Sequence, residues 1–405
     1  MDRISKRVAG LAHSATLAMS QKSQELRASG VDVINLSVGE PDFATPQHIK
    51  DAAKKAVDDN FTFYTPVAGY MSLRKAVAEK LSRENGVDFA PEQIVVGNGA
   101  KQALCNAVLT LVNPGDEVLI LTPAWVSYVE MVKLAEGKPV TVSAGLDQDF
   151  KITPAQLEAA ITPATRLMIL CSPSNPTGSV YSRDELKGLV EVMARHPQMA
   201  VISDEIYEHI NFTGSFTSLA SFEEIKDQVI VVNGVSKAYA MTGWRIGYLA
   251  APLPIAKACT KLQGQYTSGA SSIAQKAAEA AYKGPQDCVE AMCAAFRRRR
   301  DLVLELVRQI PGVKVNEPQG AFYIFPDVSA YLGTVAPDGR RIESSADVAM
   351  YLLEEAHVAT VDGAAFCAPG YIRLSYATSD YNIREALRRI ALALGKLTKE
   401  TPAAE

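Results

Sequence analysis

The sequence predicts an α/β protein with a mostly parallel central sheet, crossover helices and a smaller α/β domain. Short apolar runs alternate with amphipathic stretches, and this alternation is typical of parallel strands joined by helices. The chain of 405 residues is also too long for one small domain. Its hydrophobic content of 48% and charged content of 21% are those of a globular, enzyme-sized protein.

The central sheet is predicted from short apolar runs bounded by turn residues. These runs are QIVVG (93–97), EVLILT (117–122), RLMILCS (166–172), AVISD (200–204), VIVVN (229–233) and IGYLA (246–250). Residues 100–112 and 182–196 have the periodicity of amphipathic helices and would connect strands of this sheet.

The smaller domain is predicted from a long helical segment and the strands that follow it. Residues 286–309 form one extended helical pattern. GAFYIFPDV (320–328), HVATV (357–361) and YIRLSYA (371–377) then follow as strands among helices. We expect a large domain over residues 46–290, and a small domain formed by residues 1–45 and 291–405.

Charge and cysteine usage indicate a cytoplasmic protein that binds neither nucleic acid nor membranes. The formal net charge of −4 gives no basic field for nucleic acid or an anionic membrane surface. Six cysteines without CxxC spacing indicate reduced thiols. No apolar run approaches the roughly 20 residues that span a bilayer, and five scattered histidines do not indicate a metal site.

A glycine-rich turn follows the first predicted strand, where ligands of open α/β sheets collect. In GNGAKQAL, Gly99, Ala100 and Lys101 would present free backbone N–H groups to an anion at a helix start. A plain tight turn is the alternative, although a lysine in the first turn opposes the helix dipole unless an anion lies near. The motif does not complete GxGxxG, which argues against a dinucleotide-binding dehydrogenase.

Polar residues follow two further strands. Asn175 lies between prolines in CSPSNPTG and could form a structural turn or contact a ligand. Asp204 ends the run AVIS, and Tyr207 follows it. A carboxylate at the end of a buried strand needs a cation or several donors, unless it serves as the N-cap of a helix.

The stretch NGVSKAYAMTGWRIG, after VIVV, combines groups that suit one cofactor. Ser236 and Arg245 could hold a phosphate through charge-assisted hydrogen bonds, which leaves the Lys237 amine free to meet an aldehyde. Phosphate, aldehyde and a carboxylate partner for a ring nitrogen together describe pyridoxal phosphate.

These motifs resemble those of the class I pyridoxal-phosphate aminotransferases of fold type I. SKAYAMTGWRIG has the spacing of the family's lysine signature, and the resemblance runs over nearly the whole chain. It includes SVGEPDF, YTPVAGYMSLR, NGAKQAL, SPSNPTG, SDEIYE and YIRLSYA. GAKQAL and PAWVSY are similar to the bacterial aspartate aminotransferase branch.

The resemblance implies roles around pyridoxal 5′-phosphate. Lys237 would join the cofactor aldehyde and then move the proton from the substrate Cα, and Asp204 would keep the ring nitrogen protonated. Tyr207 and Asn175 would hydrogen-bond the ring oxygen. Trp125 would stack on the ring face, with a simple core position as the alternative.

The resemblance also implies how substrates bind. Arg373 would hold the substrate α-carboxylate in a bidentate pair, whereas the residues alone leave an internal Asp or Glu as an equal partner. Gly39 would lie at the same carboxylate when the small domain closes. Lys101 would bind the distal carboxylate of dicarboxylic substrates, with a surface lysine as the alternative.

We therefore expect a homodimeric aminotransferase that converts L-aspartate and 2-oxoglutarate to oxaloacetate and L-glutamate. Tyr64 resembles a tyrosine that reaches the cofactor phosphate of the neighbouring subunit, and an aromatic plug under a loop is the alternative. Other donors (aromatic amino acids, alanine or a glutamate–prephenate pair), a β-lyase or decarboxylase on the same fold, and a regulatory module that keeps the pocket without turnover remain as rivals.

Overall fold

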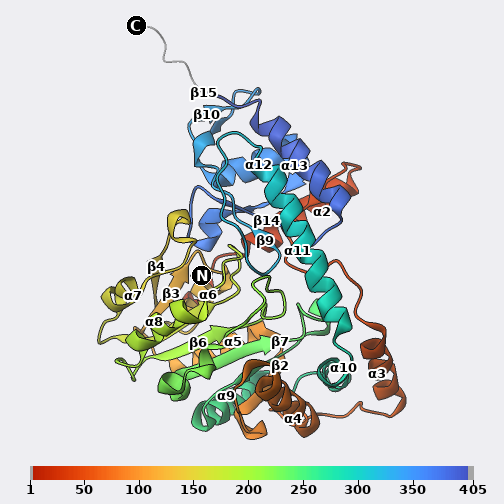
Figure 1. Ribbon diagram of the computed structural model, residues 1–405, viewed down its shortest axis with the longest axis vertical. Helices are drawn as coiled ribbons and strands as arrows, with labels where there is room; N and C mark the ends of the chain where they lie inside the picture. The colour runs from red at the N-terminus through yellow and green to blue at the C-terminus, as the bar shows by residue number, and fades with distance from the viewer. Residues whose placement is uncertain (1–2, 400–405) are drawn as a thin grey trace.

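The computed structural model of the chain describes residues 3–399 and has two bodies connected by a long helix. Figure 1 shows the central sheet with its helices in the lower body and helices α12 (Ser345–Glu355) and α13 (Asp380–Leu394) in the upper one. Helix α11 (Asp287–Val307) runs from one body to the other. Its 21 residues rise about 31 Å, which is enough to bridge both.

The central sheet has seven strands in the order β2-β8-β7-β6-β5-β3-β4. Strand β8 runs antiparallel to both neighbours, and the other pairs are parallel. The strands are β2 (Ile94–Asn98), β3 (Glu117–Thr122), β4 (Lys138–Ser143), β5 (Thr165–Cys171), β6 (Ala200–Asp204), β7 (Val229–Gly234) and β8 (Ile246–Ala250). The predicted α/β class with a mostly parallel sheet is confirmed.

The edge strand β4 is not among the sequence predictions. The six apolar runs all form strands within a residue or so of the expected bounds, because continuous apolar residues are buried on both faces of a parallel sheet. Strand β4, KPVTVS, is mostly part-buried or exposed, and only Val142 is fully buried. This edge strand therefore lacks the continuous apolar signal that identifies the other six strands.

Several helices begin at a residue whose side chain caps their free N–H groups, including α7, α8, α10, α12 and α13. At the start of α8 the Ser182 hydroxyl accepts a hydrogen bond from the backbone N–H of Glu185, and the Glu185 carboxylate accepts one from the backbone N–H of Ser182. The remaining helices of the lower body are α3 (Gln47–Asp58), α4 (Met71–Lys80), α5 (Ala100–Leu111), α6 (Ser127–Leu134), α7 (Pro154–Ala160), α8 (Arg183–Met193), α9 (Leu253–Tyr266) and α10 (Ser272–Lys283). Helices α1 (Lys6–Ala9) and α2 (Ala15–Ala28) precede them.

The upper body contains short strands packed against its helices. Of the predicted segment 320–328 only β9 (Tyr323–Ile324) is a strand, and 357–361 divides between β12 (Val358–Ala359) and β13 (Val361–Asp362). Strand β14 (Ile372–Ser375) pairs with β13 and β9. The other short strands are β1 (Ile34–Asn35), β10 (Thr334–Val335), β11 (Arg341–Ile342) and β15 (Thr398–Lys399).

The hydrophobic core has separate parts on the two faces of the sheet and in the upper body. Val229 and Val231 of β7 belong to one cluster, and Ile230 and Val232 to another, because alternate residues of a strand point to opposite faces. A third cluster joins α11, α12 and α13 and includes Tyr207 from the segment after β6. The upper body thus packs directly on a segment that leaves the sheet.

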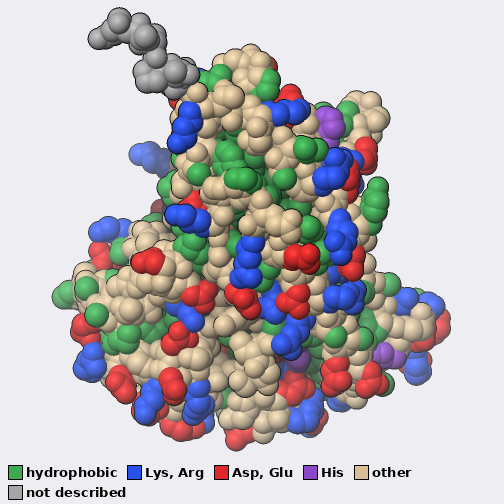
Figure 2. Space-filling model, turned by 45° about the horizontal axis from the view of Figure 1, so that its top comes forward, with side chains coloured by type: hydrophobic (Ala, Val, Ile, Leu, Met, Phe, Trp, Pro, Cys, Tyr) green, Lys and Arg blue, Asp and Glu red, His purple; other side chains and the backbone are tan. Residues whose placement is uncertain are grey.

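The surface carries charges of both signs. In the view of Figure 2, Lys and Arg side chains are intermixed with Asp and Glu. Within residues 3–399, no helix is long and apolar enough to cross a membrane.

Candidate active site

Most of the predicted site residues line one cavity of about 320 Å³. They follow successive strands of the sheet, because the carboxyl ends of β3, β5, β6 and β7 meet at one edge. The upper body and the N-terminal segment complete the lining. The predicted residues in the lining are Gly39, Ala100, Lys101, Trp125, Asn175, Asp204, Tyr207, Ser236, Lys237, Arg245 and Arg373.

Lys237 lies three residues beyond the end of β7, and its ammonium faces the N-terminal segment. Its Nζ donates a hydrogen bond to the Gly39 carbonyl oxygen at 2.6 Å. Burial, followed by the positive charge of Arg373, lowers the pKa of Lys237 to about 8. An amine with this pKa is neutral in a large fraction of molecules slightly above neutral pH, so it can act as a nucleophile or a base.

Asp204 is a buried acid without a cationic partner among residues 3–399. It is 4% exposed, and the Tyr128 hydroxyl donates to its Oδ2 at 2.6 Å. The backbone N–H of Ile206 donates to Oδ1 at 3.3 Å. Asp204 is not a helix N-cap, because no helix starts at this point. Burial raises the pKa of Asp204 to about 6, although both hydrogen bonds and Lys237 oppose the shift. A cationic ring N–H would supply the missing partner.

The start of α5 forms a cradle for an anion. Gly99 has a φ of 82°, and a Cβ there would overlap the Arg245 guanidinium. Arg245 donates only to the carbonyl oxygens of Thr242 and Asn98, at 2.9 and 3.2 Å, and pairs with no described carboxylate. The Gly99 N–H donates to the Gly97 carbonyl oxygen at 2.8 Å, whereas the N–H groups of Ala100 and Lys101 have no acceptor among residues 3–399. Two free N–H groups beside an unpaired guanidinium suit a phosphate.

The side chain of Lys101, in the first turn of α5, contacts Trp125. The Lys101 Nζ lies 4.8 Å from the centre of the Trp125 ring, within range of a cation–π contact. Burial, and then the charge of Arg245, lower the pKa of Lys101 below its ordinary value. Both residues line the cavity, where Trp125 is part-buried and Lys101 is exposed.

Arg373 is almost fully buried on β14, at 2% exposure. It donates to the Asn175 side-chain oxygen at 3.0 Å and to the Ser37 carbonyl oxygen at 2.6 Å. Its guanidinium stacks on Tyr323, 4.5 Å from the ring centre, and its buried Nε has no hydrogen-bond partner. No described carboxylate pairs with it, so the internal Asp or Glu of the alternative interpretation is absent from residues 3–399.

Several lining residues were missed by sequence reasoning. Tyr128 bonds Asp204, and the Tyr323 hydroxyl lies 2.8 Å from that of Tyr207. Tyr128 lies three residues after Trp125 in PAWVSY, so its place after a strand was an available signal. Tyr323 reaches the cavity only because β9 pairs with β14, which no local pattern reveals. The N-terminal residues Ser14, Thr16 and Leu17 also line the cavity.

Gly99 and Tyr64 stand outside the lining. Gly99 lies directly under Arg245, as described above, and immediately precedes Ala100 of the lining. The Tyr64 side chain is fully exposed at 101%, in the loop between α3 and α4. It is therefore not an aromatic plug, and its predicted contact with a neighbouring subunit stays a prediction.

Comparisons with known proteins identify the family. Residues 31–390 match the family described as aminotransferase class I and II. The chain is 49% identical to the aspartate/prephenate aminotransferase of Cereibacter sphaeroides, over 96% of this chain and 97% of that protein. It is also 49% identical to the aspartate aminotransferase of Geobacillus stearothermophilus, over 96% and 98% of the two chains.

Solved structures agree with the sequence relatives. The aspartate aminotransferase from Rhizobium meliloti superimposes with a TM-score of 0.95 at 44% identity, covering 98% of this chain and all of the other. The aspartate aminotransferase from Thermus thermophilus with maleate gives a TM-score of 0.91 at 42% identity, covering 97% of this chain. The chain belongs to the class I and II aminotransferases.

Proposed function

We propose that the protein transfers the amino group of L-aspartate to 2-oxoglutarate, with pyridoxal 5′-phosphate as its cofactor. The observation that carries the proposal is the cavity itself. Lys237, Arg245 and Arg373 line it without an ion pair to a carboxylate among residues 3–399, and Asp204 lines the same cavity without a cation in contact. A ligand with anionic groups and one cationic ring nitrogen satisfies both sets of side chains.

The residues present fit this cofactor. Asp204 would hold the ring nitrogen. Ser236 and Arg245 would hold the phosphate together with the start of α5, where the N–H groups of Gly99, Ala100 and Lys101 lie. Asn175 and Tyr207 would bond the ring oxygen, and Trp125 would cover the ring face. When bound, the cofactor withdraws electrons from the bonds at the substrate Cα.

Lys237 would carry the proton. A neutral amine with a pKa near 8 can take the proton from the substrate Cα and hold it at Nζ until it is returned. Burial is the main cause of this low pKa, and the positive charges of Arg373 and Arg245 add to it because they disfavour the protonated amine. A lower pKa makes more of the enzyme competent at neutral pH.

Arg373 would orient the substrate. Its planar fork can bind the α-carboxylate with two parallel hydrogen bonds, and burial against Tyr323 and Phe366 fixes the plane of that fork. Gly39 would lie beside the same carboxylate. Orientation by a rigid guanidinium reduces the freedom that the substrate loses on reaching the transition state.

Lys101 would select dicarboxylic substrates, because an ammonium with a desolvated stem gains most from an anionic partner. The names of the relatives support this choice, since aspartate occurs in all of those cited above. The same names favour a second acceptor. Several relatives are called aspartate/prephenate aminotransferases, including that of Nitrosomonas europaea, so prephenate is the second candidate substrate.

We further propose a cytoplasmic homodimer with shared active sites, in which exposed Tyr64 reaches the partner's cofactor phosphate. All six cysteines are free, which supports a reducing compartment. The domain boundaries proposed are residues 46–290 for the large domain, with 1–45 and 291–405 as the small one.

A donor and acceptor panel tests the function. The purified protein is incubated with aspartate, alanine or phenylalanine against 2-oxoglutarate or prephenate, and keto acid, new amino acid, ammonia and carbon dioxide are measured. The proposal predicts oxaloacetate and glutamate in equal amounts. Release of ammonia or carbon dioxide would instead identify a β-lyase or a decarboxylase. If no donor were converted, the protein would be a binding or regulatory module without catalytic activity.

A further inference from the structure

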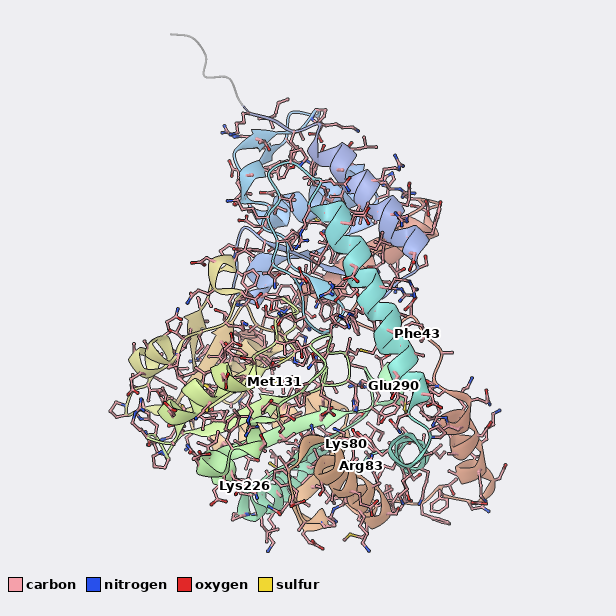
Figure 3. All side chains as sticks on the ribbon, viewed as in Figure 1. Phe43, Lys80, Arg83, Met131, Lys226 and Glu290 are labelled. Carbon is pink, nitrogen blue, oxygen red and sulfur yellow. The ribbon has the colours of Figure 1, made fainter. Side chains whose placement is uncertain are left out.

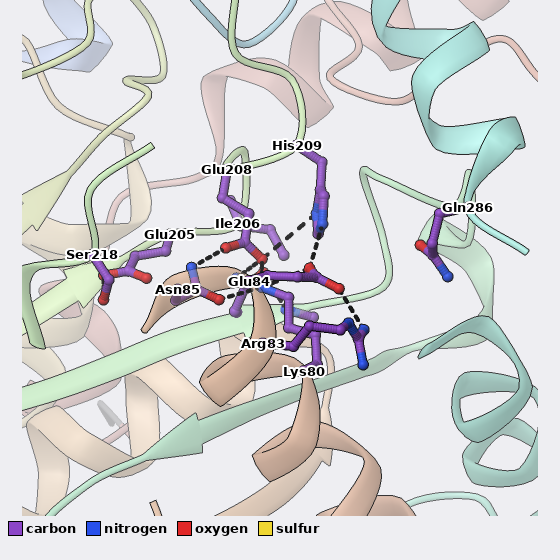
Figure 4. Close-up of polar contacts among 12 residues, drawn as sticks. Lys80, Arg83, Glu84, Asn85, Glu205, Ile206, Glu208, His209, Ser218 and Gln286 are labelled. Atoms are coloured by element: carbon purple, nitrogen blue, oxygen red, sulfur yellow. Dashed lines mark hydrogen bonds and ion pairs between the residues drawn. The ribbon is translucent and has the colours of Figure 1, made fainter. Parts of the chain in front are cut away.

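A buried polar cluster lies behind the cavity and touches none of the reacting groups. It comprises Lys80, Asn85, Glu208 and Asn233, and Figure 4 shows Lys80, Asn85 and Glu208 with their neighbours. Figure 3 places Lys80 where α4 meets the central sheet. The Lys80 side chain is 0% exposed, and none of the four residues lines the cavity. A buried charge so far from solvent needs a structural reason.

Glu208 is the centre of this cluster. Its Oε1 accepts from the Lys80 ammonium and from Asn233 Nδ2 at 2.7 Å, and its Oε2 accepts from Asn85 Nδ2 at 2.6 Å. Burial alone would raise the pKa of Glu208, but Lys80, His209 and the Asn85 bond outweigh it, so the pKa lies below its ordinary value. Glu208 is therefore a carboxylate whose bonds are all charge-assisted.

The cluster joins two chain segments that carry the proposed catalytic groups. Glu208 directly follows Tyr207 and lies four residues after Asp204, at the exit of β6. Asn233 lies in β7, four residues before Lys237. The backbone N–H of Glu205 also donates to the Val232 carbonyl oxygen at 2.9 Å. The hydrogen bond between the Glu208 and Asn233 side chains thus connects the segment after β6 to the end of β7, beyond the last backbone pair of these two strands.

A π-helix brings the other two residues of the cluster, Lys80 and Asn85, to Glu208. Leu81–Asn85 form a π-helix directly after α4, and i→i+5 bonding brings residues five apart onto one face. Lys80 accordingly donates to the Asn85 side-chain oxygen at 2.7 Å, and both residues reach Glu208. In a regular α-helix residues five apart do not face one another. This rare turn is what allows one helix end to offer two donors to the same carboxylate.

We propose that Glu208 is a positioning residue, which through Asn233 sets Lys237 relative to Asp204 and Tyr207. This inference rests on the proposed function, because it concerns the geometry of the same reaction. Glu208 would act on Lys237 through the position of the backbone, and not through its charge. After burial, the largest influences on the Lys237 pKa are the charges of Arg373, Glu40, Arg245 and Asp204, and Glu208 is not among them.

The test uses a double-mutant cycle on the full-length chain. Asn233→Ala removes the donor of this bond, whereas Glu208→Gln leaves an amide oxygen that can accept but removes the charge that strengthens the bond. The double variant carries both changes. The first readout is the pKa of Lys237 in the cofactor-free chain, measured from the pH dependence of trace acetylation at that residue. The second is kcat and KM of the cofactor-loaded enzyme with aspartate.

The matched control is Glu84→Gln. Glu84 Oε2 lies 3.0 Å from His209 Nε2 and 3.5 Å from Lys80 Nζ, but among residues 3–399 it has no hydrogen bond or ion pair with Glu208 or Asn233. Because these partners lower the pKa of Glu84 to about 2, the carboxylate is ionised and stabilises the fold. This control should lower the melting temperature without changing the Lys237 pKa or kcat.

If Glu208 positions the lysine, Asn233→Ala and Glu208→Gln each raise the pKa of Lys237 from near 8, as the amine leaves its buried place beside Arg373. Each lowers kcat by about 10- to 100-fold, as expected for supporting bonds, with KM within about threefold. The double variant should be no worse than the more severe single one, and Asn233→Ala keeps the test valid if Glu208→Gln fails to fold.

The inference would be overturned if Asn233→Ala left the Lys237 pKa and kcat unchanged and lowered only the melting temperature, as the control does. Additive shifts in the double variant would overturn it as well, since they mean two independent effects. Failure of the proposed function is a separate result. In that case the unmodified enzyme would not transfer amino groups, whereas the labelling of Lys237 would still report its pKa.

Discussion

At the residue scale, neighbouring groups determine the pKa of a side chain and whether it is free to bind a ligand. Lys101 illustrates this, because it lies over Trp125 and near Arg245 without a described carboxylate partner. Its ammonium is thus available to a ligand. An anion placed between Lys101 and Arg245 would relieve their mutual repulsion.

Replacing Lys101 by methionine tests its proposed role in specificity. The substitution keeps the apolar stem over Trp125 and removes the charge. The kcat/KM for aspartate should fall about 10- to 100-fold, as for the loss of a hydrogen bond to a charged group, while the value for alanine changes little. Steady-state kinetics with both donors measure the ratio, and equal losses would remove Lys101 from specificity.

The site residues that follow strands were predictable, and those brought in by tertiary packing were not. Asp204, Lys237 and Asn175 end or follow apolar runs, so the topology alone places them at one edge. Tyr323 comes from a different body and reaches Tyr207 across 116 positions in the sequence. Its residue type and local pattern are those of any buried strand residue.

At the scale of elements, the cradle depends on close approach between β8 and the start of α5. A Cβ on Gly247 would overlap the backbone nitrogen of Ala100, and a Cβ on Gly234 would come within 2.7 Å of the Gly247 Cα. These positions therefore require glycine because of packing. The two strands and the helix start fit together only without side chains at those points.

Gly247→Ala should therefore weaken cofactor binding. The added methyl group must push α5 away from β8, which displaces the N–H groups proposed to hold the phosphate. We expect the cofactor dissociation constant to rise about 10-fold or more, measured by absorbance titration. Gly243→Ala is the matched control in the same loop, because a Cβ there meets nothing within 4 Å, and it should bind cofactor normally. Equal affinity in both variants would refute this account of the cradle.

Elements were predicted best where burial is complete. Helix α11 agrees with its expected bounds to within two residues, and β3, β6 and β8 agree fully. Strand β4 was missed because its outer residues are solvated, and the segment 320–328 forms only a two-residue strand because its ends bond to loops. The π-helix at Leu81–Asn85 has no sequence signal, since its reason is the distant Glu208.

At the scale of the whole molecule, buried acids make stability depend on pH. Glu205 is 1% exposed, and its Oε1 accepts from the hydroxyls of Ser203 and Ser218 while Oε2 has no partner. Burial, followed by the negative charge of Glu208, raises the pKa of Glu205 to about 7 from an ordinary 4.5. Between these values the folded chain holds a proton that the unfolded chain has lost, so the free energy of unfolding falls as pH rises.

Glu205→Gln should remove this dependence. Its amide oxygen can keep the hydroxyl donors, and no charge forms at high pH. Relative to the unmodified chain, the variant should gain on the order of 3 kcal/mol of unfolding free energy at pH 8 and little at pH 4.5. Urea unfolding at both pH values, with cofactor and protein concentration fixed, measures the difference. The same gain at both values would mean that ionisation of Glu205 is not the cause.

The central claim is that Lys237 bonds covalently to the cofactor, and chemical fixation tests it most directly. The cofactor-loaded protein is treated with borohydride, digested and examined by mass spectrometry, with Lys237→Ala as the control. We predict a reduced pyridoxyl adduct on the peptide that contains Lys237 and none on that peptide in the variant. An adduct confined to another lysine, or no adduct on a protein that still transfers amino groups, would contradict the account.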